Sequence, residues 1–273
     1  MTSFQSVEGL DVRLDDAGVL RLRLDRPEKR NAIDDVMMDG LIDALDAAGT
    51  DDGVRVVVVG GSGNDFCAGA DIVARNTTAS ATPRRARTGS IQRRLPVQAH
   101  RLIPTVCSVQ VPVVCAVRGW AAGIGFQLAL AADITIAADD AQFWEPFSQR
   151  GFTPDSGATW LLPRRVGDVR ARELLLLGRK LDGREAVAWG AIHRSVAEPE
   201  LDAAVEAVVA QLASGPTVAL GLTKWLLHTG SGLSLAEHLS NEAFAMELSS
   251  RSDDFREGLA AFKERREPRF EGQ

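Results

Sequence analysis

Two short segments rich in glycine and alanine, residues 66–72 (FCAGADI) and 119–125 (GWAAGIG), constrain the fold of this chain most. Each follows an apolar run with the composition of a buried strand, over residues 54–60 and 113–117. Small side chains leave the backbone N–H groups of such turns open to a ligand. Two N–H groups that point at one oxygen would stabilise a negative charge on it. The pattern therefore predicts an α/β protein whose turns form an oxyanion hole for an acyl thioester.

Composition excludes several other classes of protein. The 273 residues are 45% hydrophobic and carry a formal net charge of -6, which fits a globular protein and argues against a nucleic-acid binder. The cysteines Cys67, Cys107 and Cys115 form no CxxC pair, and no signal peptide is evident, so we expect reduced thiols in a cytoplasmic protein. Polar residues and a proline interrupt the longest apolar tract, residues 109–138, so no membrane span is expected.

Four segments have the pattern of strands. Residues 19–24 alternate apolar and charged side chains, as a half-buried strand does. The valine run at 55–59 is unbroken and predicts a strand that is buried on both faces. Two more short strands are expected at 113–117 and 134–137.

Helices are expected between these strands and through the last third of the chain. Asp34 or Asp35 can cap a helix that ends at Gly49, and residues 124–132 form another. Beyond Trp160, apolar residues recur at helical spacing, as in the three sets Leu201, Val205, Val208, Leu212; Leu235, Leu239, Ala243, Met246; and Phe255, Leu259, Phe262. We therefore predict an α/β core over residues 1–200 and a C-terminal helical region over 201–273.

Residues 79–101 differ from their surroundings, because they contain two prolines and six arginines. This composition predicts a surface segment, either a solvated loop or a lid. A nucleic-acid role for the arginines at 84–94 is the least favoured interpretation, since no aromatic residues alternate with them.

Common catalytic motifs are missing. The chain has no GxSxG motif, and neither glycine turn has the third glycine of a dinucleotide-binding fingerprint. The four histidines have no cysteine or carboxylate at ligand spacing, so no metal site is expected. Any chemistry must then depend on carboxylates and on backbone dipoles.

Further motifs occur around the glycine turns: residues 25–32 (DRPEKRNA), 151–159 (GFTPDSGAT), 162–164 (LPR) and 257–268 (EGLAAFKERREP). These motifs and the two glycine turns occur in the order typical of the crotonase (enoyl-CoA hydratase/isomerase) superfamily. The chain resembles this superfamily over nearly its whole length. The resemblance implies a spiral of ββα turns and a coenzyme A thioester as the ligand, with no separate cofactor. It also implies a homotrimer, or a dimer of trimers, formed largely through the C-terminal helices.

The resemblance also implies roles for individual residues. The oxyanion-hole N–H groups would belong to Ala70 and Ile124, and the N-terminal dipole of a helix at Ile124 favours negative charge there. The expected contacts with coenzyme A form a larger set: Arg26, Lys29 and Arg30 at the phosphates, Ala68, Asp71 and Ile72 beside the adenine end, and Lys263 at a phosphate of a neighbouring subunit.

The chain departs from the pattern of a hydratase, which uses two glutamates to activate water. Gln127 and Phe147 occupy the two positions, and the resemblance implies that both contact the substrate. An amide is no carboxylate base at neutral pH, and phenylalanine has no proton to exchange. Hydration through two glutamates is therefore disfavoured, although Glu145, two residues from Phe147, could supply one carboxylate.

Asp155, in the sequence PDSG, is the favoured alternative acid. The resemblance to a subgroup that includes ring-opening epoxyphenylacetyl-CoA isomerase and certain enoyl-CoA isomerases gives this position the reacting carboxylate. Its apolar neighbours in sequence, Phe147, Phe152 and Trp160, favour a poorly hydrated pocket, which would raise the pKa of Asp155. The other interpretation is that Asp155 caps the helix that follows it.

The main hypothesis is an enoyl-CoA isomerase in which Asp155 moves a proton while Ala70 and Ile124 hold the enolate oxygen. A hydratase of fatty-acid degradation that uses Glu145 or Asp155 is one alternative, and a non-catalytic binder of coenzyme A thioesters is another. The partner is expected to be an acyl-CoA, not a nucleic acid or a membrane. The aromatic side chains of Phe143, Trp144, Phe147 and Trp160 either line an acyl pocket or belong to the core.

Overall fold

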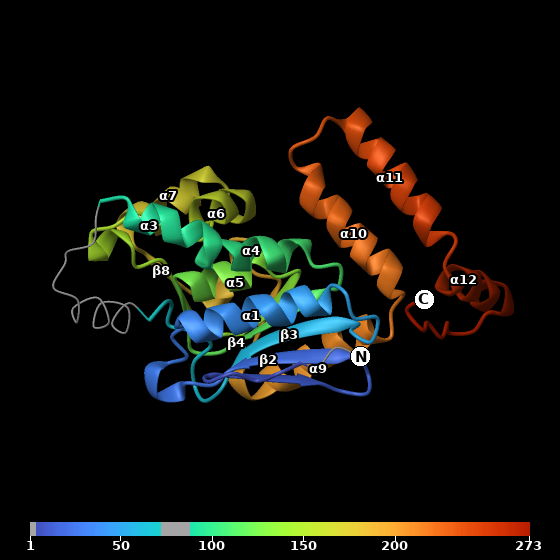
Figure 1. The fold of residues 1–273 in the computed structure, drawn as a ribbon, viewed down its shortest axis with the longest axis horizontal. Helices are drawn as coiled ribbons and strands as arrows, with labels where there is room; N and C mark the ends of the chain where they lie inside the picture. Colours follow the sequence, from blue (N-terminus) through green and yellow to red (C-terminus); the bar gives the residue numbers. More distant parts are fainter. Residues whose placement is uncertain (1–3, 72–87) are drawn as a thin grey trace.

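The computed structural model describes residues 4–71 and 88–273, and its described part is a mixed α/β fold (Figure 1). The main sheet has the order β1-β2-β3-β4-β6-β9. Only β1 runs antiparallel to its neighbour, and the other pairs are parallel. Its strands are β1 Leu10–Leu14, β2 Val19–Leu24, β3 Val56–Gly61, β4 Val113–Val117, β6 Ile134–Ala138 and β9 Arg194–Val196. The four strands predicted from the sequence are thus confirmed.

A second, three-stranded sheet begins just after β4 and has the order β5-β7-β8. Strand β5 is parallel to β7, and β7 is antiparallel to β8. The strands are β5 Trp120–Ala122, β7 Gln142–Trp144 and β8 Lys180–Asp182. Its first strand, β5, lies within the second glycine turn.

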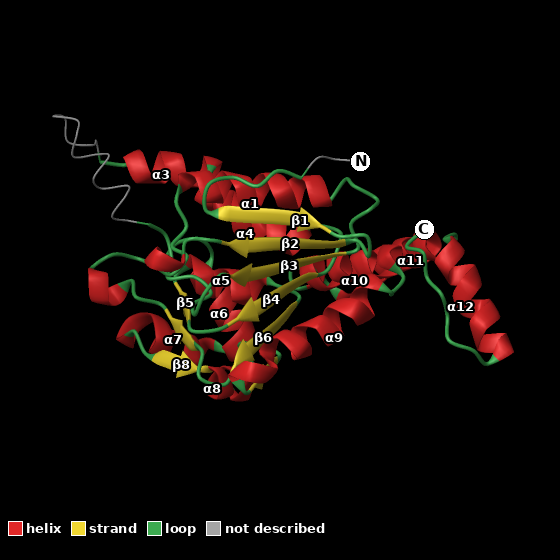
Figure 2. Cartoon of the chain, turned by 90° about the horizontal axis from the view of Figure 1, so that it is seen from below, coloured by secondary structure: helices red, strands yellow, loops and turns green. Residues whose placement is uncertain are grey.

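Helices cover both faces of the main sheet (Figures 1 and 2). On one face lie α1 Asp35–Ala48, α4 Ala99–Ser108 and α5 Ile124–Ala131, and on the other lies α9 Leu201–Ala213. Asp34 caps α1, because its side chain accepts a hydrogen bond from Met37 N. Of the two caps considered, Asp34 and Asp35, the first is therefore confirmed. The valines of β3 are buried because both faces are covered.

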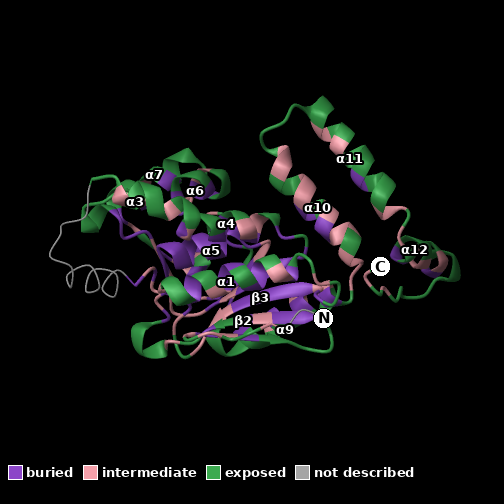
Figure 3. Cartoon of the chain, viewed as in Figure 1, coloured by how far each residue is buried: buried purple, intermediate pink, exposed green. Residues whose placement is uncertain are grey.

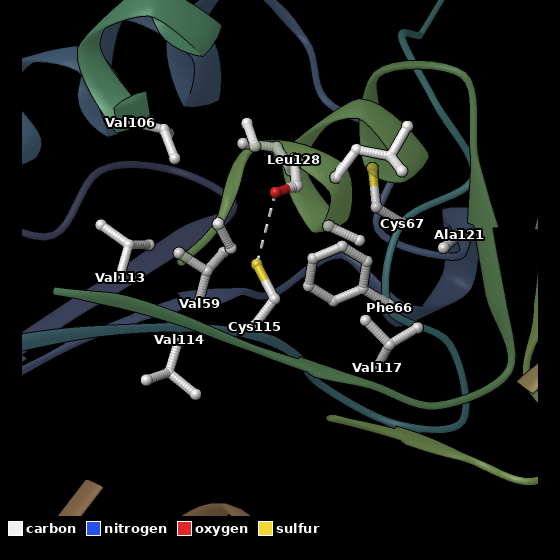
Figure 4. Packing of buried hydrophobic residues seen from close by; sticks show 14 of the residues in the cluster. Val59, Phe66, Cys67, Val106, Val113, Val114, Cys115, Val117, Ala121 and Leu128 are labelled. Carbon is white, nitrogen blue, oxygen red and sulfur yellow. Dashed lines mark hydrogen bonds between the residues drawn. The ribbon is translucent and has the colours of Figure 1, made fainter. Parts of the chain in front are cut away.

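The apolar layer between α5 and the sheet is shown in Figure 4. Phe66, Cys67, Cys115 and Val117 are all at most 1% exposed, and the Cys115 thiol donates a long hydrogen bond of 3.7 Å to Leu128 O. The layer thus buries the start of the first glycine turn and the strand that precedes the second.

The last three helices project from this core (Figure 1). They are α10 Thr217–Gly230, α11 Leu235–Ser249 and α12 Asp253–Glu264. Figure 3 shows that most of their surface is exposed. The predicted boundary at residue 200 falls before α9, but α9 buries Leu201, Val205 and Val209 against the sheet, so the projecting part begins only at α10.

The predicted surface segment at residues 79–101 is largely helical in its described part. From residue 88 onward it is described and largely helical, with α3 Ser90–Arg94, η2 Leu95–Val97 and the start of α4. The prediction of a loop up to residue 101 is therefore wrong for this part, because Ala99, Leu102 and Ile103 give α4 an apolar face that packs on the core. The remainder, with Arg84, Arg85 and Arg87, lies outside the described residues.

The remaining short elements lie between the strands and helices given above. They are α6 Ala158–Val166, α7 Asp168–Leu177, α8 Gly183–Ala188, η1 Pro27–Lys29, η3 Ser148–Arg150 and η4 Glu198–Glu200. Within residues 4–71 and 88–273, no single helix has the length and apolar character needed to cross a bilayer, and the pair of helices that passes such a test together is bent by 107°.

Candidate active site

The two glycine turns lie side by side at the ends of β3 and β4. Cys67 N donates to Trp120 O and Ala122 N donates to Cys67 O, both at 2.8 Å, which joins the turns by a parallel bridge. A Cβ atom on Gly125 would lie 2.6 Å from Cys67 O, a distance that real Cβ atoms do not reach. Glycine at position 125 therefore lets α5 begin directly against the first turn.

The N–H group of Ala70 points away from the strand that pairs with it. Ile33 N donates to Gly69 O and Asp71 N donates to Ile33 O, each at 2.8 Å. In such a parallel bridge the residue in between, Ala70, directs its own N–H to the opposite side. Among the described residues, this N–H has no hydrogen-bond partner. It is available to a ligand.

The N–H group of Ile124 is presented by the first turn of α5. Gly123 precedes it with φ of 52° and ψ of -124°, a conformation that favours glycine. Gly123 N donates to Trp144 O at 2.9 Å, which holds the turn against β7. The Ile124 N–H also has no partner within the described part of the chain, and the helix dipole adds positive potential there.

Both N–H groups belong to residues that line one cavity of about 80 Å³. Asp155, Phe147 and Ala68 line the same cavity. The two turns approach closely, since a Cβ on Gly123 would lie 3.9 Å from Gly69 Cα. The structure thus brings together the two predicted amide donors and the predicted acid, which come from three separate parts of the sequence.

Asp155 lies half-buried in the segment that precedes α6. Its neighbours Ser156 and Gly157 have φ values of 49° and 91°, so the chain turns sharply between Asp155 and the helix. The N-cap of α6 is Gly157, and no side chain caps it. The interpretation that Asp155 caps this helix is therefore wrong.

Gln127 and Glu145 form a buried pair outside the cavity wall. Gln127 Nε2 lies 3.3 Å and 3.2 Å from the two carboxyl oxygens of Glu145, and the residues are 0% and 1% exposed. Burial raises the pKa of Glu145 well above its ordinary value, the charge of Asp155 raises it further, and the hydrogen bond from Gln127 opposes both. Burial and the neighbouring charge thus favour the uncharged form of Glu145. Gln127, expected to contact substrate, does not line the cavity.

Phe147 forms part of the wall where a hydratase would carry its second glutamate. It is 5% exposed, and its ring meets Phe152 edge-on with centroids 5.4 Å apart. Arg150, three residues later, also lines the cavity and was not predicted from the sequence. The basic residue in the sequence SQRG is the signal that could have identified it.

The cations expected at the phosphates differ in their surroundings. Arg26, with a side chain only 15% exposed, forms ion pairs with Asp34 at 3.0 Å and Asp71 at 3.1 Å. Lys29 reaches the same Asp71 at 3.2 Å but remains half exposed. Arg30 is the most exposed of the three, and Ala68 N donates to its carbonyl oxygen at 2.9 Å. Lys29 and Arg30 are thus better placed than Arg26 to meet a ligand from solvent.

The remaining predicted contacts are Lys263, Ile72 and Asp71. Lys263 is exposed on α12, in the part of the chain that projects from the core (Figure 1). Ile72 lies outside the described residues. Asp71, predicted beside the adenine, is 5% exposed and holds the ion pairs described above.

A second cavity of about 290 Å³ adjoins the first, because Ser156 lines both. It lies between α4, α6 and α10, and Trp160 lines it. Of the other aromatic residues considered, Phe143 is fully buried in the core, and Trp144 donates its indole N–H to Gly178 O at 3.0 Å. The sequence did not single out the remaining members of this wall, His100, Ile103, Pro104, Cys107, Leu161 and His228.

The cysteine in the first turn is not a nucleophile. Cys67 is fully buried, and burial raises the pKa of its thiol to about 12. A thiol with this pKa is protonated at neutral pH.

Comparisons with known proteins agree with this geometry. Residues 15–273 match the family model for enoyl-CoA hydratase/isomerase, and the chain belongs to this family, within the crotonase superfamily. It is 38% identical over 256 residues to 1,2-epoxyphenylacetyl-CoA isomerase of Escherichia coli, covering 94% of this chain and 96% of that protein. It is 37% identical over 256 residues to a "Probable enoyl-CoA hydratase" of Rhodobacter capsulatus, with coverage of 94% and 95%. The crystal structure of enoyl-CoA hydratase from Bacillus anthracis superposes with a TM-score of 0.88 at 28% identity, covering 97% of this chain and 100% of that one.

Proposed function

We propose that the protein is an enoyl-CoA isomerase in which Asp155 transfers a proton within an acyl-CoA thioester. The observation that supports this most is the cavity that combines the N–H groups of Ala70 and Ile124 with a single carboxylate, Asp155. The two positions that carry glutamates in a hydratase hold Gln127 and Phe147 instead. A double-bond migration needs one acid–base group and no water, which matches this set of residues.

The proposed reaction proceeds in two proton transfers. The Asp155 carboxylate takes a proton from the carbon next to the thioester carbonyl, and the electron pair of that C–H bond forms a dienolate. Ala70 and Ile124 donate hydrogen bonds to the dienolate oxygen, and one such donor contributes roughly 3–4 kcal/mol. The protonated Asp155 then returns the proton two carbons further along the chain, which moves the double bond. Nothing is oxidised or reduced.

The remaining parts of the substrate have candidate positions. Lys29 and Arg30 are exposed cations near the first turn and suit the phosphates of coenzyme A. The acyl group would extend past Ser156 into the apolar cavity beside Trp160. Coenzyme A enters as part of the substrate, so the reaction needs no separate cofactor.

The test is the Asp155→Asn variant with a 3-enoyl-CoA, following formation of the 2-enoyl-CoA. We expect kcat to fall by roughly 10²–10⁴-fold, because a positioned base contributes that much. Asp140→Asn, at an exposed turn, is the matched control and should behave as the unaltered protein. Full turnover by a folded Asp155→Asn variant would remove Asp155 from the mechanism.

Hydration is the second candidate, favoured by the buried carboxyl of Glu145 that interacts electrostatically with Asp155. Incubation with crotonyl-CoA distinguishes the two, since a hydratase gives the 3-hydroxyacyl product. Tight binding of acyl-CoA esters without turnover of either substrate would instead favour a non-catalytic binder.

We also propose that α11 and α12 pack against further copies of the chain in a homotrimer or a dimer of trimers. Leu235 on α11 and Phe262 on α12 are 73% and 84% exposed in the single chain. Exposed apolar surface of this kind is typical of interfaces. Phe262→Asp should lower the sedimentation coefficient, and an unchanged value would contradict the role of α12.

A further inference from the structure

The buried pair Gln127–Glu145 has no part in the proton transfer proposed above. We propose that it is a positioning pair, which ties the turn that presents the Ile124 amide to the segment that forms the Phe147 wall. This inference rests on the proposed function, because it concerns how that site is held in its active geometry. The pair would act on the reaction only through the residues that it places.

The positions of the two residues in the chain support this role. Gln127 lies in the first turn of α5, and its backbone N donates to Gly123 O at 3.0 Å. Glu145 directly follows β7 and precedes two residues of the cavity wall, Pro146 and Phe147. The side-chain contact between Gln127 and Glu145, at 3.2 Å and 3.3 Å, thus bridges both sides of the cavity from behind.

A second connection joins the same two segments through the backbone. Gly123 N donates to Trp144 O at 2.9 Å. Gly123 directly precedes Ile124, and Trp144 directly precedes Glu145. The backbone bond fixes the start of the turn, and the side-chain pair fixes the helix one turn later. Two ties at different points along α5 restrict its rotation as well as its distance from β7. The direction of the Ile124 N–H depends on that rotation.

The pair requires an uncharged glutamic acid. Among the described residues, the groups that act on the Glu145 carboxyl are Gln127 from α5 and Asp155 from the segment before α6, and neither is a cation. Burial and the charge of Asp155 both raise the pKa of Glu145. The protonated acid leaves Asp155 without a second negative charge beside it at neutral pH.

The amide oxygen of Gln127 is left without a donor. Within residues 4–71 and 88–273 the buried Oε1 has no hydrogen-bond partner, while Nε2 faces both oxygens of Glu145. An ionised carboxylate has no hydrogen to offer Oε1, whereas a protonated one has an O–H. A carboxylic acid and an amide can each donate to and accept from the other. Ionisation of Glu145 would remove that donor and add a charge near Asp155.

The experiment compares Glu145→Leu, Glu145→Gln and the exposed control Glu200→Gln in the isomerisation of a 3-enoyl-CoA. Glu145→Leu should lower kcat by about 10–100-fold with little change in KM, because a small misplacement of catalytic groups costs this much. Glu145→Gln keeps a hydrogen-bonding side chain of the same size and should restore most of kcat. In the unaltered protein, ionisation of Glu145 at high pH should lower kcat/KM. This alkaline fall should disappear in Glu145→Gln and persist in Glu200→Gln.

Other outcomes would overturn the inference. If Glu145→Gln is as inactive as Glu145→Leu with an unchanged melting temperature, the Glu145 carboxyl takes part in the chemistry itself. If Glu145→Leu retains full kcat, the pair positions nothing. Should Glu145→Leu fail to fold, the pH profile of Glu145→Gln still decides, because a purely structural role predicts an alkaline limb identical to that of the unaltered protein.

The inference and the proposed function can fail separately. If the unaltered protein isomerises no 3-enoyl-CoA, the proposed function fails. The positioning role is then read from the affinity for acetoacetyl-CoA, a β-keto thioester whose enolate oxygen the two amides would bind. Glu145→Leu should weaken this affinity and Glu145→Gln should restore it. Equal affinities for all three proteins would contradict the inference.

Discussion

The turns that carry Ala70 and Ile124 present the same chemical group but are supported by different interactions. Beside Ala70, the carboxylate of Asp71 holds Arg26 and Lys29 in ion pairs. Beside Ile124, the support is a glycine backbone and the uncharged pair Gln127–Glu145. One half of the proposed oxyanion hole therefore depends on charge near the surface, and the other on close packing and burial. Changes in salt concentration or in charge should affect the Ala70 side, and added steric bulk should affect the Ile124 side.

The largest effect is expected from crowding the Ile124 turn. In Gly125→Ala the new Cβ would lie 2.6 Å from Cys67 O, so the two turns must separate. We expect kcat for the isomerisation to fall by roughly 10²–10³-fold, the usual consequence of losing one oxyanion donor. Overpacking should also lower the free energy of unfolding by roughly 1–3 kcal/mol.

Thermal denaturation and steady-state kinetics measure these two effects. The control is Gly232→Ala, because a Cβ there meets nothing within 4 Å. A Gly125→Ala variant with unaltered kcat would show that close contact between the turns is unnecessary for activity.

An intermediate effect is expected on the side of Ala70. Asp71→Asn removes the carboxylate that Arg26 and Lys29 share, and Asp71 is only 5% exposed. Arg26 retains its ion pair with Asp34, so we expect a loss of roughly 1–3 kcal/mol in the free energy of unfolding.

Urea denaturation at low salt and at high salt measures this loss. Arg30→Gln, which removes an exposed and long ion pair with Asp65, should change stability by less than about 1 kcal/mol. Equal effects of the two substitutions would argue against a distinct role for the buried carboxylate.

The smallest effect is a change in the pH dependence of stability. The pKa of Glu145 is raised in the folded protein, so folding takes up a proton at any pH between the unfolded and folded pKa values. The stability contributed by Glu145 is complete below the unfolded pKa of about 4.3 and is lost as pH rises toward the folded value.

Glu145→Gln should therefore gain stability relative to the unaltered protein between pH 5 and pH 6, by at most about 1.4 kcal/mol. Urea denaturation at the two pH values measures the difference. Parallel pH profiles for both proteins would mean that Glu145 is not protonated in the folded state.

Local patterns in the sequence predicted much of the fold because they depend on neighbouring residues. The alternation at residues 19–24 and the valine run before Gly60 gave strands, and Asp34 capped the helix that it precedes. The same reasoning also gave the helix α11, although Leu239 and Met246 of its apolar stripe are more than half exposed in the single chain. Helical spacing identifies an apolar face, but it does not identify what covers that face.

The site was predictable to a similar extent. The glycine turns, the missing carboxylates at Gln127 and Phe147, and the acid at Asp155 could all be found in the sequence. The pairing of Gln127 with Glu145 could not, because helix period and strand alternation do not specify which side chains meet across 18 residues. The burial of Arg26 against Asp71, 45 residues away, depends in the same way on the packing of the first turn.

The amino-acid sequence by itself determined the family, the strands of the core, and the two glycine turns whose small side chains leave amides exposed. The tertiary structure alone decided that these amides belong to one cavity, that Asp155 lines it, and that Glu145 is buried behind it with a raised pKa. The physical reason is that backbone conformation follows from adjacent residues. Burial, and with it the charge of a carboxyl, follows from whichever distant segments pack around it.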